Sequence, residues 1–316
     1  MSASKSIQNW LRDNKITEVE CIISDLTGIA RGKIMPASKF SESNIIRMPE
    51  SVLMLTVTGD YTNDYSMIDD AEIDIYLKPD PSTMQLLPWA AEPTAQIIHD
   101  CYDAQGELVD MAPRTVLRRV LQLYADMGLT PIVAPEVEFF LTKRNLDPDF
   151  PLEPPIGRSG RAETGRQSYS IDALNEFDPL FEDVYDFCEA QNLDVETLIH
   201  EEGLGQMEIN FLHGEALGLA DQVFLFKRTL REAALKHDMS ATFMAKPVAG
   251  QPGSSMHIHQ SLLDKDGNNV FMAADGGIGE TLRHYIGGMQ KYTKAVTALY
   301  APNVNSYRRY MREESA

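Results

Sequence analysis

Two glutamates that are two residues apart give the first indication of chemistry in this chain. Glu136 and Glu138 lie in the segment PIVAPEVEFFLTK, which has the apolar content of a strand. Because side chains alternate across a strand, both carboxylates point to one face while Val137 points to the other. Two carboxylates this close repel each other unless a cation neutralises them or one is protonated. The pair therefore indicates either a cation site or a solvated strand face.

Two later segments carry polar side chains at the same spacing. In HEEGLGQMEINFLH, Glu208 shares a face with Gln206 and Asn210, and Glu201 comes just before the glycine turn. A third segment, SSMHIHQSL, aligns three more polar side chains on one face, those of His257, His259 and Ser261. A single histidine in a strand is usually a hydrogen-bonded core residue. Three strands that offer carboxylates and imidazoles with period two favour one shared site.

The types of donor atom in these segments indicate which metal ions the site would bind. Oxygen-rich sets with at most one histidine suit Mg²⁺ or Mn²⁺ better than Zn²⁺ or copper, and no cysteine lies in these segments. Four or five carboxylates exceed what one Mg²⁺ takes from a protein, which predicts two or more ions that bridge substrate phosphates. The sequence has no GxxxxGK[ST] loop, so we expect metals and arginines to hold the phosphates of a nucleotide.

The overall charge argues against two classes of partner. The chain has 316 residues, with 28 Lys and Arg against 47 Asp and Glu, and its formal net charge is −19. Such a chain repels phosphate backbones and anionic lipid, so neither nucleic acid nor a membrane is expected as a partner. The N-terminal segment lacks the apolar stretch of a signal peptide, and the odd number of scattered cysteines indicates unpaired thiols. We therefore expect a cytoplasmic protein.

The elements that must position these side chains follow from hydrophobic periodicity and from Pro and Gly. A short helix around residues 7–11 precedes a half-buried strand at 19–23, and Pro113 and Gly128 mark the ends of a clear helix. Further elements are predicted as strands at 52–57, 96–101, 131–143, 206–213, 241–246 and 255–262, and as helices at 176–190, 215–237 and 278–299.

The chain is predicted to have two domains with an α+β fold. Composition changes at the turn DAQGE, so we place the boundary between residues 1–105 and residues 106–316. The second part contains a Pro- and Gly-rich stretch, residues 151–170, which carries three arginines in an otherwise acidic chain. It is interpreted either as a solvated loop or as a flexible loop near an anionic ligand.

Together these segments resemble the glutamine synthetase family, and most closely the branch that joins glutamate to polyamines or other amines. The matching segments follow the family's order along nearly the whole chain: DLTGIARGK, LPWAAEPTAQIIHD, APEVEFF, HEEGLGQMEINF, GQPGSSMHIHQSL and APNVNSYRRYM. The resemblance implies the glutamine synthetase fold, with a small N-terminal β-grasp domain and a larger α/β catalytic domain. It also implies a homo-oligomer, a two-ring dodecamer when full length, with active sites between neighbouring subunits.

The resemblance implies two metal sites and a use of ATP. The metal that positions glutamate would take three ligands, which match Glu138, Glu201 and Glu208. The second metal, on the nucleotide phosphates, would take two ligands that match Glu136 and His257. Mg²⁺ or Mn²⁺ is the implied cofactor. The implied reaction is attack of the γ-carboxylate of glutamate on the γ-phosphoryl group of ATP, after which an amine displaces phosphate.

Further residues are matched to the substrates. Three positions near the nucleotide match Glu196, His259 and Ser261. Gly253 falls in the glutamate-binding loop, and Arg309 matches an arginine that holds glutamate and the transferring phosphoryl group. Asp60 matches an aspartate that reaches the neighbouring subunit's site, with Asp64 as a competing match.

Three positions depart from the ammonia-using members. Ser315 stands where their flap glutamate is expected, Ser255 where they generally have glycine, and Pro252 where they have asparagine. Losing one carboxylate from the ammonium site leaves room for a larger amine such as putrescine or spermidine, which implies a role in polyamine and nitrogen metabolism. The alternatives are a glutamine synthetase that uses ammonia and a non-enzymatic assembly protein on the same scaffold.

The family continues beyond the position that matches Ala316. Further arginines for the nucleotide and a third ligand of the second metal are expected there. The chain is therefore expected to be a C-terminally truncated member, in which the set of Glu138, Glu201 and Glu208 is complete while the site of Glu136 and His257 is not.

Overall fold

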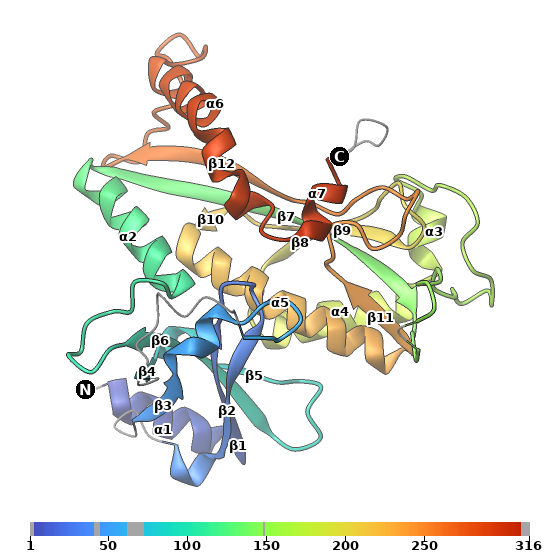
Figure 1. The fold of residues 1–316 in the computed structure, drawn as a ribbon, viewed down its shortest axis with the longest axis horizontal. Coiled ribbons are helices and arrows are strands. Elements are labelled where there is room, and N and C mark those ends of the chain that lie inside the picture. The colour runs from blue at the N-terminus through green and yellow to red at the C-terminus, as the bar shows by residue number, and fades with distance from the viewer. Residues whose placement is uncertain (1–2, 41–44, 62–72, 148, 311–316) are drawn as a thin grey trace. The chain divides into compact units, whose positions relative to one another are not determined.

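The computed structural model describes residues 3–40, 45–61, 73–147 and 149–310 (Figure 1). The chain divides into two compact units. The first comprises Met1–Leu123 with Glu189–Asn192, and the second comprises Tyr124–Cys188 with Leu193–Ala316. Each unit contains a six-stranded sheet. No described helix is long and apolar enough to cross a membrane.

The first unit is built on a mixed sheet with the order β2-β1-β6-β4-β3, in which β5 pairs with β6. Its central strands β1 and β6 are parallel and the other pairs are antiparallel. Helix α1 contributes Ile7 and Leu11, which are buried in the core of this unit as their spacing predicts. The strands are β1 (Glu18–Ser24), β2 (Ala30–Pro36), β3 (Ile46–Pro49), β4 (Asp74–Pro79), β5 (Gln85–Leu86) and β6 (Thr94–Tyr102), and the helices are α1 (Ala3–Asp13) and η1 (Ala37–Lys39), η2 (Glu50–Met54) and η3 (Pro81–Thr83).

The strand predicted at residues 52–57 is wrong, because the first half of this segment belongs to the 3-10 helix η2 and the rest is in no strand. Pro49 has φ −59° and ends the pairing of β3, so the chain turns before the apolar run begins. Ser51, Leu53 and Leu55 are nevertheless buried. A short apolar run with alternate buried positions therefore looked like a strand although its backbone is helical.

Helix α2 (Pro113–Asp126) forms as predicted, with Gly128 at φ +71° two residues beyond its end. The second unit then forms an antiparallel sheet organised around the long strand β7 (Leu129–Lys143). One edge of β7 pairs with β12 and β11, and the other pairs with β10 and β9, which in turn pairs with β8. These strands are β8 (Val195–His200), β9 (Gln206–Phe211), β10 (Gly214–Glu215), β11 (Met239–Thr242) and β12 (Met256–Asp264).

One face of this sheet is apolar and packs against α5 (Ala216–Lys236). Val137 and Phe139 are buried there, and Phe139 and Phe211 each make an edge contact with Phe226 of α5. Because side chains alternate along β7, the burial of Val137 and Phe139 on this face places Glu136 and Glu138 on the opposite face. The other helices of this unit are α3 (Ile171–Asn175), α4 (Asp178–Ala190), α6 (Glu280–Tyr300) and α7 (Val304–Arg308).

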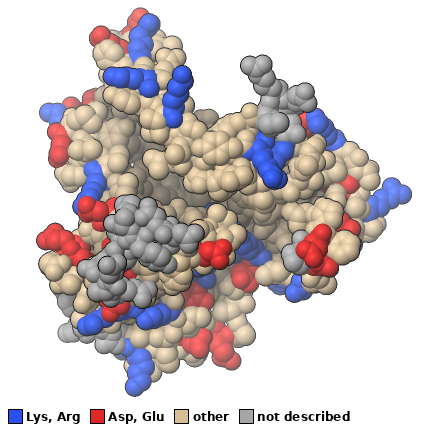
Figure 2. All heavy atoms as spheres, viewed as in Figure 1, with Lys and Arg blue, Asp and Glu red and all other residues tan. Residues whose placement is uncertain are grey.

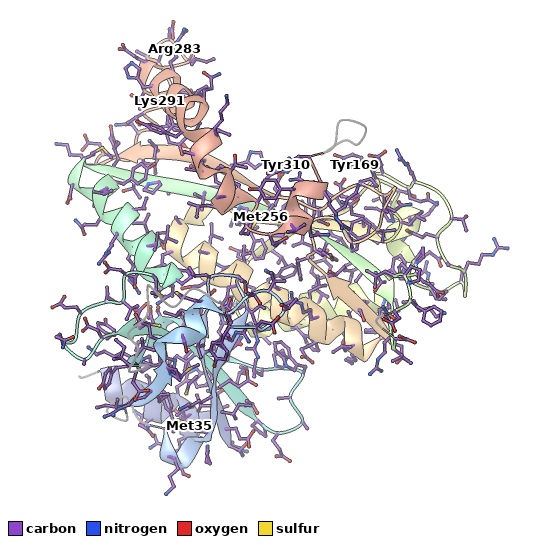
Figure 3. The ribbon with its side chains drawn as sticks, in the orientation of Figure 1. Met35, Tyr169, Met256, Arg283, Lys291 and Tyr310 are labelled. Atoms are coloured by element: carbon purple, nitrogen blue, oxygen red, sulfur yellow. The ribbon has the colours of Figure 1, made fainter. Side chains whose placement is uncertain are left out.

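Two parts of the second unit differ from their predictions. The strand predicted at 241–246 ends at Thr242, whose hydroxyl accepts a hydrogen bond from the amide of Met244 and turns the chain out of the sheet. Strand β8 was not predicted at all. Helix α6, which is described in full, buries none of its residues, and its basic side chains, including Arg283 and Lys291, stand out from it (Figures 2 and 3).

Candidate functional site

The three segments with polar side chains at period two are neighbouring strands, as the sequence indicated. Strand β7 lies between β12 and β9, and Glu136 is opposite His257 on one side and Asn210 on the other. Glu138 is opposite Glu208 on β9. The register of one sheet therefore gathers carboxylates and an imidazole from three strands onto the face away from α5.

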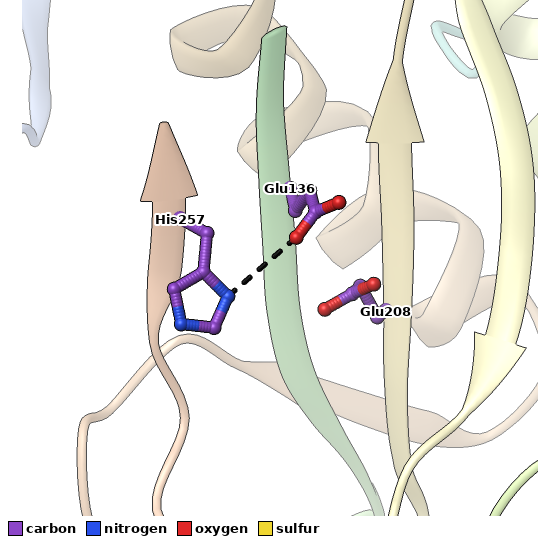
Figure 4. A group of neighbouring side chains, drawn as sticks. All are labelled: Glu136, Glu208 and His257. Carbon is purple, nitrogen blue, oxygen red and sulfur yellow. Dashed lines mark ion pairs between the residues drawn. The ribbon is translucent and has the colours of Figure 1, made fainter. Parts of the chain in front are cut away.

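Glu136, Glu208 and His257 form the most compact group (Figure 4). One ligand atom from each of these side chains lies within 4.8 Å of the other two. His257 Nδ1 is 3.6 Å from Glu136 Oε2, and His259 Nε2 is 3.0 Å from Glu136 Oε1. Two carboxylates and an imidazole at this separation can hold a divalent cation, and oxygen donors with one nitrogen suit Mg²⁺ or Mn²⁺.

Glu138 is held by its neighbours more firmly than the other glutamates. Its Oε2 accepts hydrogen bonds from the amide of Ser255 (3.0 Å) and from Gln206 Nε2 (3.1 Å). Its Oε1 accepts a hydrogen bond from the Ser255 hydroxyl at 2.5 Å. The side chain is buried, so these donors keep the carboxylate in place and leave a lone pair of Oε1 for a cation.

Burial and mutual repulsion raise the pKa of two of these glutamates. The pKa of Glu208 rises to about 7, first through burial and then through the charges of Glu136, Glu201 and Glu138. The pKa of Glu201 is also raised, by burial and by Glu138. Neighbouring carboxylates that raise the pKa of these two glutamates form a concentration of negative charge that a divalent cation would relieve. The donor set thus fits the divalent metals implied by the sequence.

The residues predicted to contact the nucleotide lie in two separate places. His259 and Ser261 lie on β12 and line a pocket of about 530 Å³ together with residues of β7, His213 and Gly214. Glu196 is exposed on β8, where the register of β8 with β9 shifts between Val195 and Thr197. It is not among the residues that line this pocket.

The two residues predicted to hold glutamate are in contact. A Cβ added to Gly253 would lie 2.7 Å from Arg309 Cγ and 2.8 Å from the carbonyl oxygen of Ala245, so only glycine leaves room for the arginine. The buried Arg309 Nε has no hydrogen-bond partner among the described residues. Met256, which opens β12, and Tyr310, which follows α7, appear in the same part of Figure 3.

The segment that carries Arg309 is tied to the loop before β12 by one side chain. Asn305 Oδ1 accepts a hydrogen bond from the amide of Lys246 (2.8 Å), and Asn305 Nδ2 donates to the Lys246 carbonyl (2.9 Å). Lys246 Nζ in turn donates to the carbonyl of Gln251. These bonds position α7 next to Gly253.

The residues predicted to serve a neighbouring subunit are only partly described. Asp60 belongs to the first unit, is exposed, and accepts a hydrogen bond from the hydroxyl of Thr58 at 2.7 Å. Asp64 and Ser315 lie outside the described residues. The role of Asp60 therefore stays a prediction.

Sequence reasoning did not single out three residues that organise this region, Glu163, His200 and Asn305. Glu163 bonds to His200, which is 37 positions away, and no local pattern connects them. His200 directly precedes Glu201 in the segment HEEGLGQ, but its spacing gave no reason to assign it a partner. Asn305 lies in APNVNSYRRYM, where only Arg309 was assigned a role.

Comparison with known proteins gives a consistent result. Residues 110–316 match the catalytic domain of glutamine synthetase. Gamma-glutamylputrescine synthetase PuuA of Escherichia coli is 35% identical over 92% of this chain and 63% of its own length. A glutamine synthetase of Pyrococcus abyssi is 33% identical over 92% and 61%. A glutamate–isopropylamine ligase of a Pseudomonas species is 31% identical over 96% and 67%.

Solved structures agree on the fold. The ligand-free form of GmaS superposes with a TM-score of 0.82 at 26% identity, over 96% of this chain and 68% of the other. The crystal structure of a novel glutamine synthase homolog gives a TM-score of 0.80 at 22% identity. The chain spans less than two thirds of the length of PuuA and of the Pyrococcus enzyme. The predicted glutamine synthetase fold is confirmed, and the match over residues 110–316 shows that the chain belongs to the glutamine synthetase family.

Proposed function

We propose that this protein joins the γ-carboxylate of glutamate to an amine, with ATP as the phosphoryl donor and a γ-glutamyl phosphate as the intermediate. The observation that carries the proposal is the convergence of Glu136, Glu138, Glu208 and His257 on one face of three adjacent strands. A side-chain nucleophile is not required for this chemistry. What it requires is positioning and charge stabilisation around a transferring phosphoryl group.

In the proposed site, Glu138, Glu201 and Glu208 hold one divalent ion and Glu136 and His257 contribute to a second. Such ions neutralise the charge that develops on the phosphoryl oxygens. The contact of His257 Nδ1 with Glu136 and the hydrogen bonds of Ser255 to Glu138 would keep these ligands in place before the ions bind.

The chain's own residues would position the substrates around these ions. Arg309, packed against Gly253 with an unbonded Nε, is suited to hold a carboxylate of glutamate. The pocket beside His259 and Ser261 offers room for part of the nucleotide, whose phosphates would then approach Glu136. Glu196 is proposed to act in nucleotide binding in the assembled enzyme.

The proposed second substrate is a polyamine or another amine larger than ammonia. Two of the relatives bear names that specify such amines, putrescine and isopropylamine. Ser255 stands beside Glu138, where its hydroxyl bonds to the carboxylate, and it departs from the glycine of the ammonia-using members. Such an enzyme would act in polyamine and nitrogen metabolism in the cytoplasm. We propose that it is a homo-oligomer in which Asp60 of one subunit reaches the active site of its neighbour.

A glutamine synthetase that uses ammonia is the second candidate. It is favoured by the relatives from Pyrococcus, which carry that name and are also about a third identical to this chain. Both candidates need the same metal ligands, so they differ only in the amine. A non-enzymatic assembly protein would have no use for a cluster of four glutamates in which burial and neighbouring charges raise the pKa of Glu201 and Glu208.

The experiment is an amine panel. The full-length protein is incubated with ATP, glutamate and Mg²⁺, together with putrescine, spermidine, isopropylamine, methylamine or ammonia, and released phosphate is measured. The proposal expects phosphate and a γ-glutamyl amide with at least one organic amine. Turnover with ammonia alone supports the second candidate, and no turnover with any amine supports the assembly protein.

A further inference from the structure

One buried carboxylate, that of Glu163, helps to fasten the Pro- and Gly-rich stretch at residues 151–170 to the sheet. Glu163 Oε1 lies 2.7 Å from His200 Nε2, and Glu163 Oε2 accepts a hydrogen bond from the amide of Gly205 at 2.5 Å. The exposed fraction of the side chain is 8% for Glu163 and 0% for His200. The interpretation as a purely solvated loop therefore does not hold for this part of it.

His200 in turn contacts the backbone of Glu201, a proposed metal ligand. Its Nδ1 lies 2.7 Å from the carbonyl oxygen of Glu201, while its Nε2 faces Glu163. Both ring nitrogens thus have an oxygen partner, which fixes the orientation of the ring. The backbone at Glu201 is held by a side chain whose own position depends on Glu163.

The turn that Glu163 holds joins β8 to β9 and begins with Glu201, and Glu208 is the third residue of β9. Gly205 in this turn has φ +70°, and a Cβ there would lie 2.5 Å from the carbonyl oxygen of Leu141. A second tie from the same stretch is the hydrogen bond from the Tyr169 amide to the His200 carbonyl at 2.9 Å. The turn has little room to adjust, so the contacts of Glu163 and Tyr169 hold its start, where Glu201 lies.

We propose that Glu163 is a positioning residue for the metal site, which acts through His200 and Gly205 to hold Glu201 beside the β9 carboxylate of Glu208 in a geometry that binds a divalent ion. This inference rests on the metal site of the proposed function. It assigns a role to the loop at 151–170 that does not require the loop to touch any substrate.

The same unit contains a matched pair that lies outside the site. Asp183 of α4 bonds to His237, which follows α5, at 2.5 Å, and both side chains are largely buried at 19% and 23% exposed. Asp183 also bonds to Lys236. Loss of this carboxylate removes a histidine partner, as loss of Glu163 does, but it changes nothing at Glu201.

The test compares Mn²⁺ binding in five proteins by the electron paramagnetic resonance of free Mn²⁺: the unchanged chain, Glu163→Ala, Glu163→Gln, Asp183→Ala and Glu138→Ala. The Mn²⁺ sites that are lost in Glu138→Ala identify the proposed metal site. Glu163→Ala is expected to weaken this binding about tenfold or more, the effect typical of groups that orient metal ligands. Circular dichroism and melting curves measure the loss of stability in each variant.

Glu163→Gln is expected to keep binding within about threefold of the unchanged chain. Its amide can donate to His200 Nε2 and accept from the Gly205 amide, which preserves both contacts. Asp183→Ala is expected to lower the melting temperature without changing the Mn²⁺ affinity. If Glu163→Ala does not fold, Glu163→Asp replaces it, because the shorter side chain cannot reach both partners.

The outcomes separate the inference from the proposed function. Unchanged Mn²⁺ affinity in folded Glu163→Ala would overturn the positioning role. Equal weakening in Asp183→Ala would also overturn it, since the effect would then follow from stability alone. If the unchanged chain has no Mn²⁺ site that Glu138→Ala removes, the metal site itself is refuted and the inference is lost with it.

Discussion

Replacing Glu208 by Gln is expected to stabilise the metal-free protein at alkaline pH while it weakens metal binding. Glu208 is buried, and its pKa in the folded protein is about 7 because of burial and three neighbouring carboxylates. Its reference value is 4.5. Glutamine has nearly the same shape and no charge, so the substitution removes the repulsion without leaving a cavity.

The size of the effect follows from the shift in pKa. A carboxyl group whose pKa is raised on folding costs no stability below its unfolded pKa, and the cost grows as pH rises toward the folded pKa. A rise from 4.5 to about 7, at about 1.4 kcal/mol per unit, amounts to roughly 3 kcal/mol at pH 8 and only a small part of that at pH 5. For a unit of this size, the melting temperature of Glu208→Gln at pH 8 is expected to be higher than that of the unchanged protein by roughly 6 °C or more.

The assay is calorimetric melting at pH 5 and pH 8, with and without Mg²⁺, with Glu92→Gln as the control because Glu92 is exposed. Glu208→Gln should melt higher than the unchanged protein at pH 8 without metal. Added Mg²⁺ should raise the melting temperature of the unchanged protein more than that of the variant. A variant that melts lower at pH 8 without metal would refute the account of charge repulsion at this site.

Three further substitutions test other parts of the site. Glu138→Ala in the full-length protein should retain its fold and lose orders of magnitude in phosphate release, because it removes a proposed metal ligand; unchanged turnover would rule out that role. Asn305→Ala removes two hydrogen bonds to Lys246, worth about 1 kcal/mol each, so amide exchange in residues 247–255 should accelerate roughly thirtyfold, and unaltered exchange would show that the tie is unimportant. Gly253→Ala should displace Arg309 and weaken the binding of glutamate measured by calorimetry. Unchanged glutamate affinity would show that the contact between Gly253 and Arg309 has no part in substrate binding.

The sequence predicted the central strands and the face on which their polar side chains lie. Period two in APEVEFF and SSMHIHQSL requires Glu136, Glu138 and His257 to share a face with their like-spaced neighbours. The apolar residues Val137 and Phe139, which alternate with these glutamates, indicate which face of the strand is buried. These signals are local, and for this reason they could be interpreted without a structure.

What the sequence could not predict depends on contacts between distant segments. The bonds of Glu163 to His200 and of Asn305 to Lys246 join positions 37 and 59 residues apart, and no periodicity links them. The helix η2 was mistaken for a strand because its apolar residues are buried at alternate positions in either conformation. The short strands β2 to β5 depend on pairing with neighbours more than on their own residues.

The most direct test of the central claim is an anomalous-scattering map of crystals that contain Mn²⁺. The account predicts manganese at the face of β7, β9 and β12, with one ion bounded by Glu138, Glu201 and Glu208 and another beside Glu136 and His257. Carboxylate oxygens should lie about 2.0–2.3 Å from these ions, as in other oxygen-rich divalent sites. Saturating Mn²⁺ that gives no peak on this face would contradict the claim that these strands form a metal site.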